Sequence, residues 1–180
     1  MPDKREARDH MERNVEIKAR ITDFASLTTK VSGLSNPEPV DMRQDDTFFH
    51  CELGRLKLRV RDDGTGVLIF YRRENALGPK ESFFVCSETK EPDALRTTLS
   101  LAYGQAGRVR KHRTLFVAGR TRIHLDRVEG LGDFLELEVE LGDGDTTEGG
   151  MREVHDVMAE LGISDTQLVD KAYIDLLDAV

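Results

Sequence analysis

Apolar and charged residues alternate along several short segments of this chain, and this alternation constrains its fold more than any other feature. In residues 13–21, Val15 and Ile17 alternate with Glu16 and Lys18. Successive side chains of a β-strand point to opposite faces, so a period of two residues is typical of a strand with one apolar face. The same signal predicts eight strands in one antiparallel structure, at residues 13–21, 44–52, 55–61, 67–73, 81–87, 108–117, 120–128 and 133–141.

Turn and helix signals between these segments complete the prediction of an α+β fold. An Asp-Gly pair at residues 63–64 separates two alternating runs, which is typical of a β-hairpin. Capping residues and closing glycines predict four helices outside the strands, from Asp23 to near Gly33 and at residues 93–103, 151–161 and 165–178. The charged, aperiodic residues 1–12 are expected to be a flexible N-terminal segment, and residues 13–180 a single domain.

The polar faces of the predicted strands carry charges instead of the neutral residues of an ordinary wet surface. One strand places Lys57 and Arg59 on the same face, and residues 133–141 place Glu136 and Glu138 on the same face. Like charges close together on one face lower stability unless a counter-charge neutralises them. Periodicity alone leaves two explanations open. One is a lattice of cross-strand ion pairs on an open sheet, and the other is a closed sheet whose charged interior binds an oligo-anion.

A closed sheet with a charged interior would contain both halves of a site for a polyphosphate and its divalent metal. Lysine and arginine bind phosphate oxygens, arginine in a bidentate manner. Mg²⁺ and Mn²⁺ prefer carboxylate oxygens, and protein-bound Mg²⁺ is held partly by the phosphates of its substrate. The carboxylates available for such an ion are Glu16, Asp126, Glu136 and Glu138.

Composition limits the cellular compartments and the classes of binding partner that can be expected for the protein. The formal net charge of the 180-residue chain is -8, which argues against general nucleic-acid affinity because a phosphate backbone would be repelled. Cys51 and Cys86 lack metal-ligand spacing, which is consistent with a reduced compartment. The first residues contain no apolar core of a signal peptide, and no apolar run approaches the length of a membrane span. A cytoplasmic protein without membrane contact is expected.

Residues 13–20, RNVEIKAR, resemble the E-x-E-x-K signature of the CYTH superfamily, also called triphosphate tunnel metalloenzymes. This superfamily includes class IV adenylyl cyclases, thiamine triphosphatases and inorganic triphosphatases. The similarity continues in the order of the family over nearly the whole chain, through QDDTFF, GRLKLR, FYRR, RKHRTLF, TRIHLDRVEGLGDFLELEVEL and DKAYIDLL. It favours the closed sheet over the ion-pair lattice.

The resemblance implies an eight-stranded antiparallel β-barrel that binds a triphosphate, with Mg²⁺ or Mn²⁺ as cofactor. The implied substrate-binding residues are Lys18, Lys57, Arg59, Arg72, Lys111, Arg113 and Arg122, with Arg73 less favoured than Arg72. The implied catalytic residues are Lys18, Arg59, Lys111 and Arg113. The implied metal ligands are Glu16, Asp126, Glu136 and Glu138. Lys80 and Lys171 are looser candidates near the mouth of the tunnel.

Asn14 departs from the family signature, because it stands where the first glutamate is expected. An amide oxygen can ligate a cation but adds no charge, so one metal position is expected to be weaker or absent. His124 shares a face with Arg122 and Asp126. It is interpreted first as a residue that supports Asp126, with substrate contact or proton transfer as the alternative.

The activity implied by the resemblance is metal-dependent processing of a triphosphate. The leading hypothesis is hydrolysis of the phosphoanhydride of an inorganic, nucleoside or thiamine triphosphate. One alternative is a class IV adenylyl cyclase that makes cyclic AMP from ATP, and a second is a non-catalytic module that binds polyphosphate. The expected partner is a triphosphate-containing small molecule, and neither nucleic acid nor a membrane. The oligomeric state is left open, with a homodimer as one option.

Overall fold

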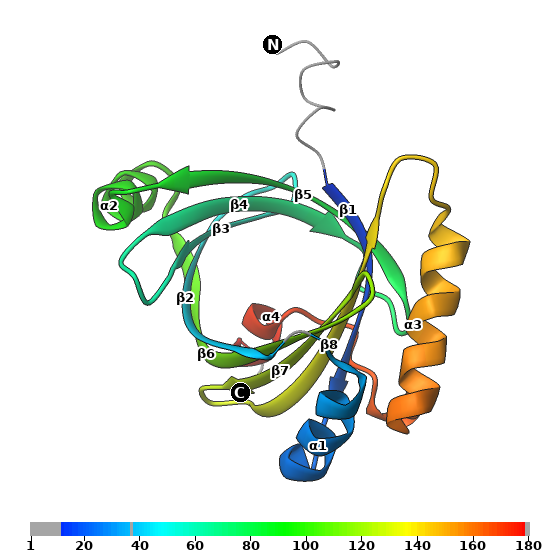
Figure 1. The fold of residues 1–180 in the computed structure, drawn as a ribbon. Helices are drawn as coiled ribbons and strands as arrows, with labels where there is room; N and C mark the ends of the chain where they lie inside the picture. Colours follow the sequence, from blue (N-terminus) through cyan, green and yellow to red (C-terminus); the bar gives the residue numbers. More distant parts are fainter. Residues whose placement is uncertain (1–11, 37, 179–180) are drawn as a thin grey trace.

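The computed structural model describes residues 12–36 and 38–178, and its strands close into one antiparallel barrel (Figure 1). The strands are β1 (Glu12–Arg20), β2 (Val40–Phe49), β3 (Arg55–Val60), β4 (Gly66–Arg73), β5 (Lys80–Thr89), β6 (Gln105–Ala118), β7 (Thr121–Val128) and β8 (Gly132–Leu141). They follow the order β1-β5-β4-β3-β2-β6-β7-β8 around the barrel. All neighbouring pairs are antiparallel. The predicted eight-stranded barrel with flanking helices is confirmed. Residues 1–11, most of the segment expected to be flexible, lie outside the described residues.

The helices of the described chain are α1 (Phe24–Leu34), α2 (Pro92–Tyr103), α3 (Thr147–Leu161) and α4 (Tyr173–Leu177), with a short 3₁₀ turn at Asp165–Gln167. The Asp23 side chain caps α1 as predicted, because it accepts a hydrogen bond from the Ser26 N–H at 2.9 Å. The Thr146 side chain caps α3 in the same way, so this helix begins earlier than the predicted residue 151. None of these helices has the length and apolar character needed to cross a membrane.

The helix predicted at residues 165–178 is wrong over most of its length. Between the 3₁₀ turn and α4, the chain runs beside the end of β1. Leu168 forms an antiparallel bridge with Ala19, and the Val169 N–H donates to the Lys18 carbonyl at 2.8 Å. Hydrogen bonding to β1 therefore replaces the helical pattern in this segment.

The apolar face of β1 points away from the barrel interior. Val15 and Ile17 of β1 pack in a buried cluster with Leu27 of α1 and Val154 of α3. Figure 1 shows α3 beside β1 and β8, with α2 on the other side of the barrel, and α1 contacts β6, β7 and α3. Because helices cover the apolar faces, the charged faces of the same strands are left to line the interior.

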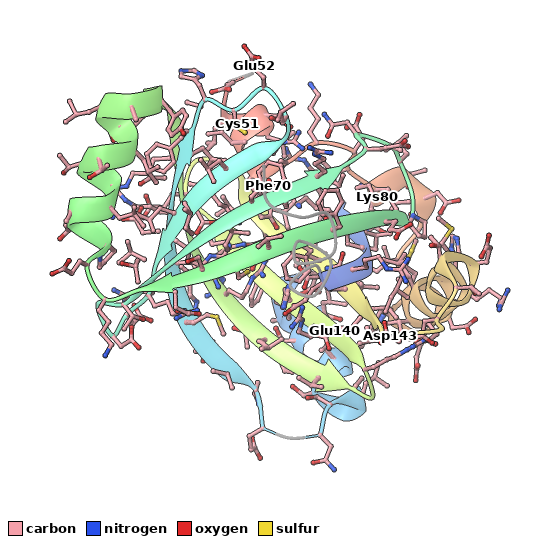
Figure 2. All side chains as sticks on the ribbon, turned by 90° about the horizontal axis from the view of Figure 1, so that it is seen from above. Cys51, Glu52, Phe70, Lys80, Glu140 and Asp143 are labelled. Atoms are coloured by element: carbon pink, nitrogen blue, oxygen red, sulfur yellow. The ribbon has the colours of Figure 1, made fainter. Side chains whose placement is uncertain are left out.

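A second apolar cluster lies where α4 meets the barrel. Tyr173 and Ile174 of α4 pack there with Phe48, Val109 and Phe134. Figure 1 looks along the barrel and shows α4 lying across it. In Figure 2, the β2–β3 turn marked by Cys51 and Glu52 lies toward one end and Glu140 toward the other. α4 therefore lies at the end of the barrel marked by the β2–β3 turn.

Candidate active site

Inward-facing side chains from all eight strands line one cavity of about 380 Å³ inside the barrel. The cations that line it are Lys18, Lys57, Arg59, Arg61, Arg73, Lys111, Arg113 and Arg122. The carboxylates that line it are Glu16, Asp46, Glu88, Glu136 and Glu138. The strand alternation thus brings most of the predicted charged residues together.

Asp46 of β2 holds two of the cations on one wall of the cavity. Its two carboxylate oxygens accept from Arg59 Nε and Nη2, both at 2.7 Å, and from Lys57 Nζ at 2.9 Å. Burial opposes ionisation of Asp46, but Arg59 and Lys57 together hold the pKa of its carboxyl well below its usual range. Asp46 was not among the predicted site residues. Its role becomes clear from the β2–β3 register, which pairs Asp46 with Arg59 and which the sequence alone does not show.

Asp126 of β7 holds a second pair of cations. It accepts from Arg113 Nε and Nη2, both at 2.6 Å, and from Lys111 Nζ at 3.1 Å. Burial, followed by the neighbouring Arg113, lowers the pKa of Lys111 to about 7. Asp126 was predicted as a metal ligand, but the structure places it among cations that already use its oxygens.

Tyr173 joins the Asp126 group from α4. Its hydroxyl donates to Asp126 Oδ2 at 2.8 Å. Its ring centroid lies 4.2 Å from Lys18 Nζ and 5.0 Å from Lys111 Nζ. A cation over an aromatic face is attracted by the ring. Tyr173 was not among the predicted site residues, since it lies outside the alternating strands.

His124, Glu136 and Glu138 form a group with the composition of a metal site. One ligand atom of each lies within 4.8 Å of the others. His124 Nδ1 is 3.7 Å from Glu136 Oε2 and 3.7 Å from Glu138 Oε1. Glu136 also accepts from Lys18 Nζ at 2.8 Å and from Arg113. The expectation that His124 supports Asp126 is wrong, because β7 pairs His124 with Glu136 and its nitrogen faces the glutamates.

Glu16 of β1 adds a further carboxylate beside this group. The β1–β8 register pairs it with Glu138, and its Oε1 lies 3.2 Å from Arg73 Nε. Burial raises the pKa of Glu16, and the negative charge of Glu136 raises it further. Carboxylates that disfavour one another's charge, beside an unpartnered imidazole nitrogen, are a donor set that fits a divalent cation.

Arg72, which was expected to bind the substrate, does not line the cavity. Arg72 lies on the outer face of β4, where its Nε donates to the Leu53 carbonyl at 2.6 Å and its guanidinium packs over Phe70. Its neighbour Arg73 faces the cavity instead. Adjacent residues of a strand point to opposite faces, so only one of the two arginines can point inward.

The remaining predicted residues lie at the margins of the site. Arg122 lines the cavity and is paired with Glu138 at 3.3 Å. Lys80 is buried, and its Nζ donates to the Ala76 carbonyl at 2.9 Å. Lys171 is exposed. Asn14 lines the cavity, and its side-chain oxygen has no hydrogen-bond partner among the described residues.

Comparison with known proteins agrees with this architecture. The CYTH domain family matches residues 12–173. Adenylate cyclase CyaB of Aeromonas hydrophila is 26% identical over 168 residues, which cover 88% of this chain and 85% of that protein. The PH1012 protein of Pyrococcus horikoshii OT3 superposes with a TM-score of 0.80 at 25% identity, covering 91% of this chain and 98% of that one. The PH1819 protein of the same organism has a TM-score of 0.71 at 22% identity, covering 92% and 98%.

Proposed function

Because the chain belongs to the CYTH domain family, we propose that it is a divalent-metal-dependent enzyme that hydrolyses a phosphoanhydride bond of a triphosphate. The observation that carries this proposal is the convergence of lysines and arginines from β1, β3, β4 and β6 in one cavity that also contains a carboxylate–imidazole group. A cavity of about 380 Å³ falls within the size of small-molecule sites.

Two groups of cations on the cavity walls, one held by Asp46 and one by Asp126, would bind the phosphates. Asp46 orients Lys57 and Arg59, and Asp126 orients Lys111 and Arg113, so these donors are fixed before the substrate arrives. Donors fixed in advance stabilise charge that develops during phosphoryl transfer without a cost of reorganisation. Lys18 and Arg73 would bind oxygens near the carboxylate group, and Lys18, Arg59, Lys111 and Arg113 would neutralise the transferring phosphoryl group.

Glu136, Glu138 and Glu16 are the residues proposed to hold the divalent cation. When bound, Mg²⁺ or Mn²⁺ supplies charge neutralisation at the phosphoryl oxygens and helps to orient the substrate. Asp126 is not included, because it is fully buried outside the residues that line the cavity, where its oxygens accept hydrogen bonds from Arg113, Lys111 and Tyr173.

Adenylyl cyclase activity is the second candidate, because the Aeromonas relative bears that name and aligns with 88% of this chain. In that reaction, the ribose 3′-hydroxyl of ATP attacks the α-phosphate and pyrophosphate leaves. Hydrolysis needs only the phosphate-binding walls, the metal ligands and water. Cyclisation needs in addition a subsite that holds the nucleoside against the α-phosphate. Hydrolysis is therefore the leading proposal.

Phosphate release and cyclic AMP formation can be measured on the same preparation. We expect the protein to release phosphate from tripolyphosphate, ATP or thiamine triphosphate with Mg²⁺ or Mn²⁺. Removal of one metal-binding charge in Glu136→Gln should lower the rate at least about 100-fold, a scale typical of losing one electrostatic contact to the transition state. Glu129→Gln is the control, because Glu129 is exposed outside the cavity.

The products distinguish the three activities. Cyclic AMP without free phosphate from ATP would favour the cyclase. Tripolyphosphate binding with neither product would leave a non-catalytic binding module. Equal rates for wild type and Glu136→Gln would contradict the proposed site.

A further inference from the structure

The imidazole of His124 lies beside the proposed metal-binding carboxylates Glu136 and Glu138. We infer that His124 Nδ1 is itself a ligand, together with Glu136 and Glu138. This makes the site a mixed nitrogen–oxygen centre that favours first-row transition cations such as Mn²⁺ over Mg²⁺. The inference concerns the same site as the proposed function and rests on its being a metal site.

The His124 nitrogen is buried without a partner. The residue is 4% exposed, and Nδ1 has no hydrogen-bond partner among the described residues. A buried polar nitrogen left unpaired costs free energy, so such atoms normally contact a protein group, water or an ion. Its position is therefore best explained by a ligand that occupies the space in front of it.

The distances around Nδ1 suit a shared cation better than direct hydrogen bonds. Nδ1 lies 3.7 Å from a carboxylate oxygen of Glu136 and 3.7 Å from one of Glu138. Hydrogen bonds between nitrogen and oxygen span about 2.7 to 3.2 Å. Two ligand atoms that each lie about 2.2 Å from one ion are separated by about 3 to 4 Å. His124 Nδ1 thus lies at a distance from each glutamate oxygen that two ligands of one ion would have.

Supporting Asp126 is not a satisfactory alternative role for His124. Asp126 accepts hydrogen bonds from Arg113, Lys111 and Tyr173. On the neighbouring strands, the register places His124 beside Glu136 of β8 and Leu115 of β6. The polar surface available to Nδ1 is therefore the glutamate side of the cavity.

The identity of the ligand atoms predicts which metal is preferred. Mg²⁺ binds oxygen and retains its waters, whereas first-row transition cations also accept imidazole nitrogen, Mn²⁺ less strongly than the cations that follow it. A neutral nitrogen beside two carboxylates therefore adds more affinity for Co²⁺, and to a smaller extent for Mn²⁺, than for Mg²⁺, whose binding depends on negative oxygen ligands. Asn14 stands where the family signature has a charged residue, so it removes a negative charge that would favour Mg²⁺.

Electron paramagnetic resonance of Mn²⁺ bound to the whole protein tests this inference without substrate. We expect spin-echo spectra to contain the nitrogen coupling of a directly bound imidazole. In His124→Asn, this coupling should disappear and Mn²⁺ affinity should fall at least about tenfold, whereas Mg²⁺ affinity, measured by competition, should fall less than about threefold. His112→Asn is the matched control, because His112 lies half-exposed on β6 outside the cavity lining and should change neither quantity.

Wild-type protein alone can overturn the inference, whatever the folding of the variants. Bound Mn²⁺ without imidazole coupling, or no Mn²⁺ binding, would contradict it. Equal losses of Mn²⁺ and Mg²⁺ affinity in His124→Asn would reject the claimed preference. Phosphate release without the coupling would remove His124 as a ligand and leave the proposed hydrolase intact. Coupling without phosphate release would support the ligand and reject the hydrolase.

Discussion

At the scale of single residues, Asp46 is a counter-ion whose place a substrate phosphate could take. Asp46→Asn would leave Lys57 and Arg59 buried without their carboxylate, so we expect the unfolding free energy to fall by about 3 kcal/mol. Tripolyphosphate should recover much of this loss, because its oxygens would supply the missing negative charge. Urea unfolding with and without tripolyphosphate measures both effects.

The neighbouring Asp45 provides the control for this experiment. Asp45 points to the opposite face of β2 and pairs with the solvent-exposed Arg108 at 2.6 Å. Exposed pairs contribute about 0 to 1 kcal/mol, so Asp45→Asn should cost little and should not respond to tripolyphosphate. If the deficit of Asp46→Asn were the same with and without the anion, Lys57 and Arg59 would not be phosphate ligands.

Whether an inward-pointing side chain could be predicted from the sequence depends on how clearly apolar and charged residues alternate in its strand. In β1 and β8, charged residues alternate with apolar ones, so the inward positions of Lys18, Glu136 and Glu138 could be predicted. In β4, Val67 and Leu68 are apolar on both faces, and nothing but the three-dimensional register distinguishes Arg72 from Arg73. His124 could be placed on a face from its strand, but its glutamate neighbours depend on pairing between strands.

At the scale of elements, α4 depends on a glycine in β6. A Cβ atom at Gly107 would lie 2.5 Å from Ile174 Cδ1, and the φ of +153° at Gly107 is one that other residues rarely adopt. Gly107→Ala should therefore force the Ile174 side chain out of its present position, disturb its packing in α4 and lower the unfolding free energy by about 1 to 3 kcal/mol. Because Tyr173 adjoins Ile174, stabilisation by tripolyphosphate should fall too, which thermal unfolding can measure.

Gly119→Ala separates backbone strain from the clash with α4. Gly119 also has a positive φ, of +61°, but no atom lies within 4 Å of its Cβ position. Its substitution should lower stability modestly and leave the tripolyphosphate effect unchanged. Adding Ile174→Ala to Gly107→Ala should restore part of the ligand effect. If the two substitutions had additive effects on the stabilisation by tripolyphosphate, residues 107 and 174 would not compete for this space.

The elements themselves were predictable where their signals are local. The alternation of a strand and the Asp23 cap of α1 each involve residues only a few positions apart in the chain, and both were predicted. The course of residues 165–172 was not, because it depends on the Val169 hydrogen bond to Lys18, more than a hundred residues away in the chain. The part of the site that belongs to α4 was missed for the same reason.

At the scale of the whole molecule, a cationic cavity lies inside an acidic protein. Eight lysines and arginines and five acidic residues line the cavity, an excess of three positive charges, whereas the whole chain carries a net charge of -8. The field inside a cavity is set by its lining, and the field far from the surface is set by the total charge. Small anions that enter the barrel should therefore bind, and long anions that stay outside should be repelled.

This contrast predicts selectivity by size among polyanions. Tripolyphosphate should raise the melting temperature by several degrees, and raising NaCl from about 50 to 500 mM should weaken its binding at least about tenfold, because added salt screens the cavity charges. A 20-base-pair DNA duplex should give no shift even at low salt, because it is too wide for a cavity of about 380 Å³ and meets an acidic exterior. Calorimetric titration at several salt concentrations gives the affinities. Binding of the duplex at low salt, or tripolyphosphate affinity that does not change with salt, would show that the cavity charges do not govern anion recognition.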